Sequence, residues 1–393
     1  MSDQQTWFER NAKKTLFGIV AVFVLLAVGV TEYVLEKALP PPAPVRRHIR
    51  LREHPPNLNS LIRLKARTLG KLQNAQVDDL DRTEYSLRTD ANGFIRPSRI
   101  YDDPDFSLVF VGGSTTECLV VDEDKRFPYR VGVALSEKFN KKINSYNAGF
   151  RANNSYHCLN VLLNKIVPLR PDMVVLMENI NDVNALLLSS GQSYWSGPKS
   201  RSLLVVEQDT TGRLERLSSA IREAVFPGIA FRLGMGRGAA ENDLVGEREE
   251  AAKERAPKTV PANIVEEFAA NLNIFVSICR ARKITPVLMT QFNRFKENPD
   301  HKVRKTMEKV QADTGVDYAT YKGLLDRFNA AIRKVARENG VLLIDLEANV
   351  PKESAYLYDI VHLNTQGSLL VADLIAAAMA KSEAVQRRLE ARS

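Results

Sequence analysis

The chain has 393 residues, of which 44% are hydrophobic and 26% are charged, with 20 glycines and 18 prolines. This composition excludes a disordered chain, a collagen-like repeat and a protein that crosses a membrane many times. The net charge is +8, but basic and acidic residues are interleaved, as in Glu247-Arg248-Glu249-Glu250, so we expect no nucleic-acid partner. The cysteines, Cys118, Cys158 and Cys279, lie far apart, so we expect no metal site and no disulfide framework.

The first element in chain order is a run of 17 uncharged, mostly apolar residues between Lys14 and Glu32. This length is near the lower limit for a membrane-spanning helix. We therefore predict a short tail at residues 1–14 and one transmembrane anchor at residues 15–35. A cleaved signal peptide is the alternative, because basic residues precede the run, but no small-x-small cleavage pattern follows it closely.

Basic residues flank the apolar run on both sides, so their count alone does not orient the helix. A short tail before a long domain favours the tail inside the cell. We expect a single-pass protein of the cell (inner) membrane with its main domain outside the cytoplasm. Residues 36–104 are interpreted as a proline-rich linker and a pre-domain element, in which Asn92-Gly93 predicts a hairpin turn.

Five short apolar runs predict buried strands at residues 106–111, 143–148, 173–177, 286–289 and 341–346. Apolar residues at helical spacing predict helices at 126–139, 155–167, 264–282 and 321–338, and a last helix that is capped by Asn364 or Thr365 and ends near Lys381. Strands that alternate with helices predict an α/β fold with an open, doubly wound, parallel five-stranded sheet. This domain spans residues 105–385, and residues 185–262 break the rhythm as an insertion.

Polar residues follow each predicted strand, and ligands of such sheets bind at the carboxyl ends of the strands. The segments, in chain order, are GGSTTE (112–117), NAG (147–149), NIND (179–182), QFNR (291–294) and DIVH (359–362). A serine, a glycine, an asparagine and an Asp/His pair are therefore expected at one edge of the sheet. These are the residue types that acyl transfer at a serine requires.

In this order, GGSTTE, NAG, NIND and DIVH resemble the four sequence blocks of the SGNH (GDSL-type) esterase and acyl-hydrolase superfamily. The resemblance covers about residues 105 to 380. It implies that Ser114 is the nucleophile, His362 the general base and Asp359 the residue that orients the base. It also implies an oxyanion hole made by the backbone N–H groups of Ser114 and Gly149 and the side chain of Asn181.

Physical chemistry supports these roles independently, because a serine hydroxyl needs a neighbouring imidazole to take its proton. His157 is the alternative base. One departure from the family pattern is Asn179, which stands where the third block usually opens with glycine. Substrate contacts are expected from polar residues near the same edge, namely Glu117, Asp182, Gln291 and Asn293. Tyr194 and Trp195 either stack on a sugar ring or pack the insertion.

The leading hypothesis is a membrane-anchored serine ester hydrolase that removes acyl groups, such as acetyl, from an extracytoplasmic glycan or lipid without a cofactor. One alternative is an O-acyltransferase that uses the same serine, in which a sugar hydroxyl instead of water resolves the acyl-enzyme. The other is a catalytically silent SGNH-like module that binds a glycan or serves in a membrane complex. Labelling by a serine-directed fluorophosphonate separates an active serine from a silent module.

Overall fold

The computed structural model describes residues 10–38, 51–63, 84–188, 194, 260 and 262–390. Most of the predicted insertion at 185–262, including Trp195, lies outside these residues, as does much of the region 36–104. The chain forms two compact units, one made of Met1–His48 with Val206–Gly246 and the other of Ile49–Val205 with Glu247–Ser393. The second unit carries the sheet, and the division of the chain into the four predicted domains stays a prediction.

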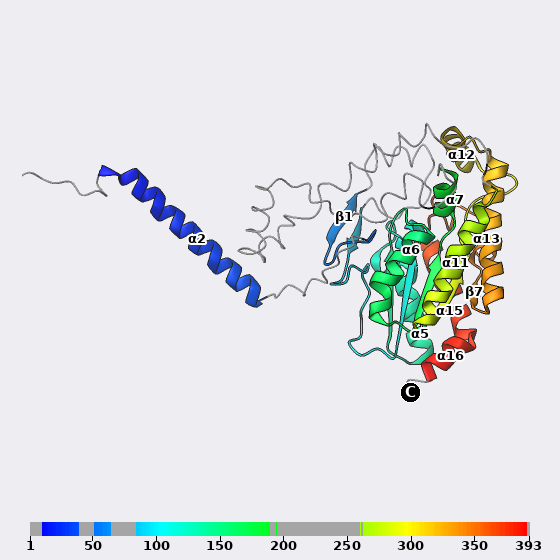
Figure 1. Ribbon diagram of the computed structural model, residues 1–393, viewed down its shortest axis with the longest axis horizontal. Helices are drawn as coiled ribbons and strands as arrows, with labels where there is room; N and C mark the ends of the chain where they lie inside the picture. The colour runs from blue at the N-terminus through cyan, green and yellow to red at the C-terminus, as the bar shows by residue number, and fades with distance from the viewer. Residues whose placement is uncertain are drawn as a thin grey trace, which may run out of the picture. The chain divides into compact units, whose positions relative to one another are not determined.

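The first unit contains helix α2 (Ala12–Ala38), drawn in blue in Figure 1. Within it, the 20 residues Ala12–Thr31 have a mean hydropathy of 2.2, and none of this stretch is buried. Apolar side chains such as Phe17, Phe23 and Leu25 are exposed around the helix. The helix is therefore long and apolar enough to cross a membrane, and an N-terminal signal sequence has the same properties.

The second unit is built on a parallel sheet of five strands in the order β4-β3-β5-β6-β7. The strands are β3 (Phe106–Gly112), β4 (Ile143–Gly149), β5 (Met173–Met177), β6 (Thr285–Met289) and β7 (Leu342–Ile344). All five predicted strands are thus confirmed, and the last is shorter than expected because a helix begins at Leu346. The direction in which strands are added reverses between β3 and β5, so their carboxyl ends flank the switch point where ligands bind in such sheets.

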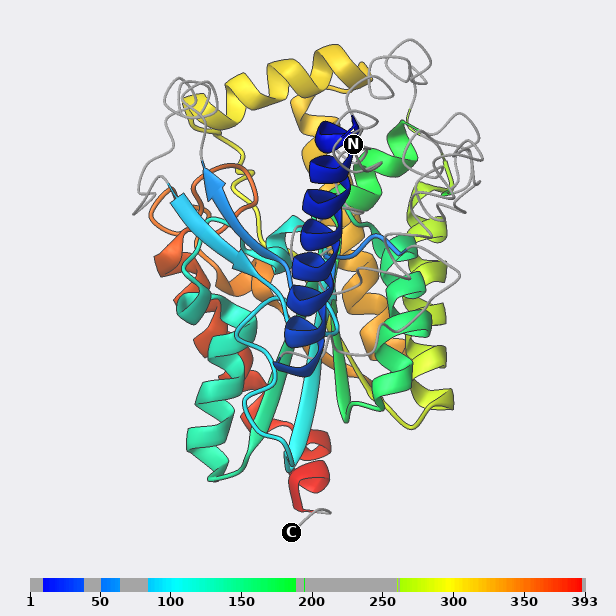
Figure 2. The same ribbon diagram turned by 90° about the vertical axis from the view of Figure 1, so that its left-hand side faces the viewer.

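Helices cover both faces of this sheet, as Figure 2 shows, with α5 and α15 on one side and α6 and α11 on the other. Alternate residues of a strand point to opposite faces. Accordingly, Val109 and Val111 of β3 pack in one core, whereas Leu108 and Phe110 pack in the other. Both faces of β3 are buried, which explains why its sequence is continuously apolar.

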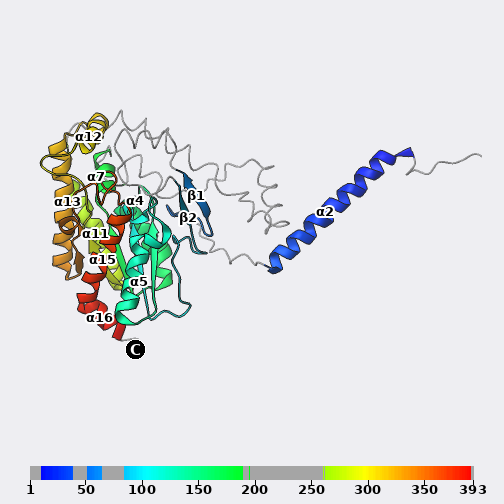
Figure 3. The ribbon, with the colours of Figure 1, turned by 180° about the vertical axis from the view of Figure 1, so that it is seen from behind.

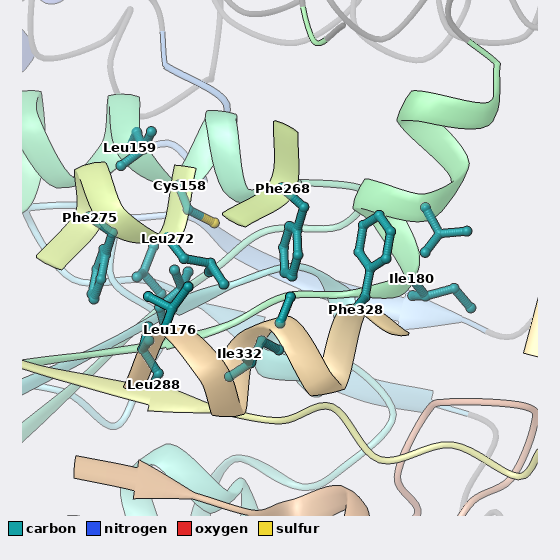
Figure 4. Close-up of a cluster of buried hydrophobic side chains, with 14 of the residues drawn as sticks. Cys158, Leu159, Leu176, Ile180, Phe268, Leu272, Phe275, Leu288, Phe328 and Ile332 are labelled. Atoms are coloured by element: carbon teal, nitrogen blue, oxygen red, sulfur yellow. The ribbon is translucent and has the colours of Figure 1, made fainter. Parts of the chain in front are cut away.

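The first of these cores joins α11 and α13 to the sheet (Figure 4). Phe268 of α11 stacks on Phe328 of α13, with ring centroids 4.6 Å apart. Leu176 and Leu288 of the sheet lie in the same cluster. The second core lies on the opposite face, where α15 runs beside α5 (Figure 3). These two layers hold the strand ends in fixed positions relative to one another.

The helices of this unit agree largely with the prediction. They are α4 (Ser114–Glu117), α5 (Phe127–Phe139), α6 (Ser155–Val161), α7 (Ile180–Leu187), α11 (Ile264–Ala281), α12 (His301–Thr314), α13 (Tyr318–Asn339), α14 (Leu346–Asn349), α15 (Thr365–Lys381) and α16 (Glu383–Glu390), with short 3-10 or π turns at Glu123–Lys125, Leu162–Ile166 and Val167–Leu169. Asn364 caps α15 by accepting the Gly367 N–H at 2.9 Å. The predicted helix at 155–167 is continuous in the sequence pattern but changes from α to π geometry at Leu162.

Before β3, the chain forms a small antiparallel pair of strands, β1 (Asn59–Arg63) and β2 (Glu84–Arg88). The predicted turn at Asn92-Gly93 is confirmed, with Gly93 at a φ of +75° and its N–H bonded to Asp90 O at 3.0 Å. Beyond the turn, Phe94 is fully buried in the first core of the sheet domain. This part of the pre-domain element therefore packs as part of the same unit.

Candidate active site

Ser114 lies just beyond the carboxyl end of β3, as the first residue of helix α4, and is half-buried. Asn181 lies near the start of α7, just after the neighbouring strand β5. A Cβ atom on Gly113 would lie 2.5 Å from Nδ2 of Asn181. Only a glycine at this position therefore lets the Asn181 amide lie against the turn that carries Ser114.

Ser114 contacts His362, a residue 248 positions away, with 2.7 Å between Ser114 Oγ and His362 Nε2. On the other side of the ring, His362 Nδ1 lies 2.7 Å from Oδ2 of Asp359. The second oxygen of Asp359 accepts the backbone N–H groups of Val361 at 2.9 Å and His362 at 2.7 Å. The structure thus brings together the serine, the histidine and the aspartate that the sequence analysis singled out.

The electrostatics of this group favour a charged His362. Desolvation lowers the pKa of His362, but the negative charge of Asp359, its hydrogen bond and the charge of Glu117 raise it, and the net pKa is above the ordinary value. For Asp359, desolvation raises the pKa, but the His362 ring and the two backbone N–H groups lower it below the ordinary value. His362 can therefore accept the Ser114 proton while Asp359 remains ionised.

Gly149 ends strand β4 and is buried, and its backbone N–H donates to Oδ1 of Asn147 at 2.9 Å. That N–H is therefore already engaged within the protein. A Cβ atom on Gly149 would collide with the backbone N of Glu117, so the glycine allows β4 to approach α4 closely. In the described part of the chain, no hydrogen bond joins the Gly149 N–H to Ser114 or Asn181, and its role as an oxyanion donor stays a prediction.

The loop after β4 contains a residue that the sequence analysis missed. Ala152 has a φ of +59°, which is strained for a residue with a Cβ atom. The next residue, Asn153, accepts the Asn181 Nδ2–H at its carbonyl oxygen at 2.7 Å, so this loop lies beside Asn181. Among the described residues, no hydrogen bond engages the Ala152 N–H. A positive φ at alanine has no signature in the sequence, so only the structure identifies this residue.

Glu117 is completely buried. Its Oε1 atom lies 2.7 Å from Nε2 of His54 and 3.4 Å from Nη2 of Arg151. His54 is itself only 4% exposed and lies in the segment before β1. The side chain of Glu117 therefore joins the end of α4 to the pre-domain element, and its predicted contact with a substrate has no support in this geometry.

The other residues expected to bind substrate are also buried. Gln291 is 2% exposed, and its side chain donates to Thr115 Oγ1 at 3.0 Å and accepts the Ile180 N–H at 2.9 Å. Gln291 thus ties the residue after Ser114 to the residue before Asn181. Both its amide nitrogen and its amide oxygen thus have partners within the protein.

Asn293 is 3% exposed and accepts the Phe295 N–H at 3.0 Å. Asp182 is completely buried and accepts hydrogen bonds from Ser155 and from the Tyr194 hydroxyl, which lies 2.6 Å away. Neither carboxamide nor carboxylate is presented to solvent. Tyr194 itself is 3% exposed, so its ring packs in the protein and does not form a surface for a sugar.

Two further predictions concern His157 and Asn179. His157 is buried and takes part in the cap of α6, where its Nδ1 accepts the Asn154 N–H at 3.1 Å. Its contact is thus with a helix terminus, whereas His362 is the ring that contacts Ser114. Asn179 precedes α7, and its side chain donates to Leu325 O at 3.0 Å. The departure from glycine therefore links the loop after β5 to α13.

Arg294, which stands in the QFNR segment after β6, is also buried. Its backbone N–H donates to Ile360 O at 2.9 Å, and its guanidinium contacts Leu357 O at 3.3 Å and Asp300 at 2.5 Å. Arg294 thus holds the loop that carries Asp359 and His362. In the sequence it stands in a polar segment like many solvated loops, so no local signal distinguishes it.

Among the described residues, no group of His, Cys, Asp and Glu side chains has the arrangement of a metal site.

The search of curated proteins gives no match. Similar solved structures include Axe2, an acetylxylan esterase from Geobacillus stearothermophilus, with 16% identity and a TM-score of 0.40 over 71% of this chain and 96% of that chain. A structure described as a GDSL-like lipase from Parabacteroides merdae has 13% identity and a TM-score of 0.41 over 71% of this chain and 98% of that chain.

The assignment to a family rests on a different comparison. The family model of GDSL-like lipases and acylhydrolases matches residues 110–370, which is more than half of the chain. The matched range begins within β3, extends into α15, and includes Ser114, Asn181 and His362. The chain therefore belongs to the GDSL-like lipase/acylhydrolase family and is a hydrolase of ester bonds.

Proposed function

We propose that the protein is a serine-dependent esterase that removes acyl groups, with acetyl as the expected group, from a glycan or lipid outside the cytoplasm. The observation that carries this proposal is the continuous chain of hydrogen bonds from Ser114 through His362 to Asp359, each 2.7 Å long. A hydroxyl, an imidazole and a carboxylate in this order form an activated nucleophile.

In the first half of the reaction, Ser114 Oγ attacks the ester carbonyl carbon as His362 Nε2 takes its proton. The charged ring is stabilised by Asp359, whose position is fixed by two backbone N–H groups. The tetrahedral intermediate then collapses, the bond to the leaving alcohol breaks, and His362 returns the proton to that alcohol. In the second half, His362 deprotonates water, which attacks the carbonyl carbon of the acyl-enzyme. The bond to Ser114 Oγ then breaks, and His362 returns the proton to Ser114 Oγ, which releases the carboxylic acid and regenerates the free serine.

The negative charge on the carbonyl oxygen requires donors that are already in place. We assign this role to the Ser114 N–H and to the Asn181 amide, which lies against Gly113 at the turn. The third expected donor, the Gly149 N–H, is engaged by Asn147, and the N–H of Ala152 in the adjacent loop takes its place in the proposal. The strained φ of Ala152 supports this assignment, because such strain is concentrated at functional sites.

Helix α2 supports the proposed location of the substrate. An apolar helix of this length, exposed on all sides, supports one membrane span and therefore an enzyme that works close to a membrane surface. A short N-terminal tail before a long domain favours the domain outside the cytoplasm. An acylated glycan or lipid is the class of ester that such an enzyme would reach.

The test is labelling of the purified full chain with a fluorophosphonate, followed by hydrolysis of p-nitrophenyl esters from acetate to octanoate. We expect the full chain to be labelled, Ser114→Ala to remain unlabelled, and acetate to be the best ester. Ser136→Ala, a change in helix α5, is a matched control and should keep the label.

An unlabelled wild-type chain would favour the silent module over the esterase. A labelled chain that hydrolyses long esters best would reject acetyl as the acyl group. If the label is present but the acyl group moves to an added sugar alcohol and not to water, the protein is a transferase.

A further inference from the structure

The segment Leu51–His54, which precedes the small β1–β2 pair, docks on the loop that follows β4. Arg52 Nε donates to Asn153 Oδ1 at 3.1 Å, and Arg52 Nη2 donates to Arg151 O at 3.2 Å. In return, Asn153 Nδ2 donates to Arg52 O at 3.1 Å. Main-chain and side-chain atoms of one arginine thus hold a loop about 100 positions away in the sequence.

Aromatic contacts strengthen this docking. The Arg52 guanidinium lies over the Phe150 ring, 5.7 Å from its centroid, and the His54 ring contacts the same phenyl ring with centroids 4.9 Å apart. Arg52 is only partly exposed, so the planar guanidinium is held between the ring and the Asn153 amide. Because the Arg52 guanidinium donates two hydrogen bonds, to Asn153 and to Arg151 O, it fixes the orientation of the loop as well as its distance.

The loop held by Arg52 carries the partner of Asn181. Asn153 uses its side chain to bind Arg52 and its carbonyl oxygen to accept the Asn181 Nδ2–H at 2.7 Å. Asn153 is completely buried and sits next to Ala152, with its positive φ. A change in the position of Asn153 would therefore move the Asn181 amide.

The same segment also reaches the helix of the catalytic serine. His54 Nε2 lies 2.7 Å from Glu117 Oε1 at the end of α4, and both side chains are buried. A Cβ atom on Gly93 would collide with His54 O, so the turn at Asn92-Gly93 closes over this segment. Leu51–His54 is thus attached to the Ser114 helix and to the loop beside Asn181 at the same time.

We propose that Leu51–His54 is a positioning element of the oxyanion hole, and that Arg52 acts through Asn153 to orient the Asn181 amide. This inference rests on the proposed function, because it assumes that Asn181 stabilises the oxyanion. Arg52 does not touch the reacting atoms. The consequence is that catalysis depends on a segment outside the sequence blocks of the family, and that segment follows the proline-rich stretch after α2.

The experiment is a double-mutant cycle in the full chain, with kcat and KM measured on p-nitrophenyl acetate. Arg52→Ala is expected to lower kcat by about 10- to 100-fold with little change in KM, because a loosened donor stabilises the transition state less. The double variant with Asn181→Ala should be only slightly slower than Asn181→Ala alone, because both changes disable the same donor.

Arg88→Ala is the matched control. Arg88 belongs to β2 of the same pre-domain element, is about half exposed and pairs with Glu123, 2.5 Å away. Its removal should leave kcat unchanged. If Arg52→Ala does not fold, as judged by its thermal unfolding, the cycle is run with Arg52→Lys, which keeps the charge but loses the fork to Asn153 and Arg151 O.

Two outcomes would overturn the inference: losses from Arg52 and Asn181 that multiply, or an Arg52 variant as active as Arg88→Ala. Failure of the proposed function looks different, because the wild-type chain would then hydrolyse no ester, or Ser114→Ala would hydrolyse it as well as the wild-type chain. If Ser114→Ala is inactive but the losses of kcat from Arg52→Ala and Asn181→Ala multiply, only the role of Arg52 is rejected. The role of Arg52 would be supported if Arg52→Ala lowers kcat in the wild-type chain but causes little further loss in the Asn181→Ala variant.

Discussion

The Asp359 carboxylate holds the His362 ring at Nδ1 and directs Nε2 toward Ser114. Its negative charge also stabilises the imidazolium that forms when the serine proton is taken. Because the base must be neutral before each turnover, the pKa of His362 sets the lower pH limit of activity. The geometry and the electrostatics of this residue pair can be tested separately from binding.

Asp359→Asn should lower kcat strongly and move the acid limb of the pH profile to lower pH. In the wild-type protein, the raised pKa of His362 places this limb above the ordinary value of 6.5, and activity is lost as the pH falls through it. Without the carboxylate charge, desolvation lowers the pKa of His362, so the ring stays neutral at a more acidic pH. The measurement is kcat/KM for a chromogenic ester as a function of pH. An acid limb that moves to higher pH in the variant would contradict the assignment of Asp359.

Asn181→Ala should lower kcat by about 10²- to 10³-fold, the usual effect of removing one oxyanion donor. The side chain is small and partly exposed, so the thermal unfolding temperature should change little. Steady-state kinetics on p-nitrophenyl acetate measure the effect. Asn273→Ala, a change on the exposed side of α11, serves as the control. Unchanged turnover in Asn181→Ala would remove this residue from the site.

At the scale of elements, the catalytic edge depends on the close approach of α4 to the ends of the strands. The backbone of β4 at Gly149 lies directly against the backbone of Thr116 and Glu117 in α4. Helix α13 is different, because the position of Gly323 is open, with no atom near the place where a Cβ would stand. The same substitution should therefore have opposite effects in the two elements.

Gly323→Ala should stabilise the protein by about 0.5–1 kcal/mol, because alanine has less backbone freedom to lose in a helix. Gly149→Ala should destabilise it, because the new methyl group meets backbone that cannot move without shifting α4. Thermal unfolding of both variants is the measurement. A stabilised Gly149→Ala would show that β4 and α4 are not in the contact described.

At the scale of the whole molecule, the proposed location of the enzyme rests on α2. The full chain should sediment with membranes and resist alkaline extraction, because the helix exposes apolar side chains around its whole surface. Leu25→Lys places a charge within the span at a cost of about 3 kcal/mol, so it should release part of the protein, whereas Leu25→Ile should not. A soluble wild-type protein with a trimmed N-terminus would instead identify the segment as a cleaved signal.

Much of this molecule could be predicted from the sequence, because the signals concerned are local or ordered along the chain. Apolar runs of strand length and helical periodicity predicted all five strands and most long helices. Helix α12 was missed, because among its described side chains Val303 and Met307 are the only buried apolar ones in a charged segment. The DIVH block placed Asp359 three residues before His362, and the structure confirms that one turn joins them.

What the sequence alone determined is thus the fold class, the family and the residues that meet at one edge of the sheet. Only the tertiary structure decided that Glu117, Asp182, Gln291 and Asn293 are buried, that the Gly149 N–H is engaged by Asn147, and that Arg52 holds the loop beside Asn181. For Glu117, Asp182, Gln291 and Arg52, the physical reason is that their hydrogen-bond partners lie between 12 and 176 positions away along the chain, and such contacts have no periodicity in the sequence.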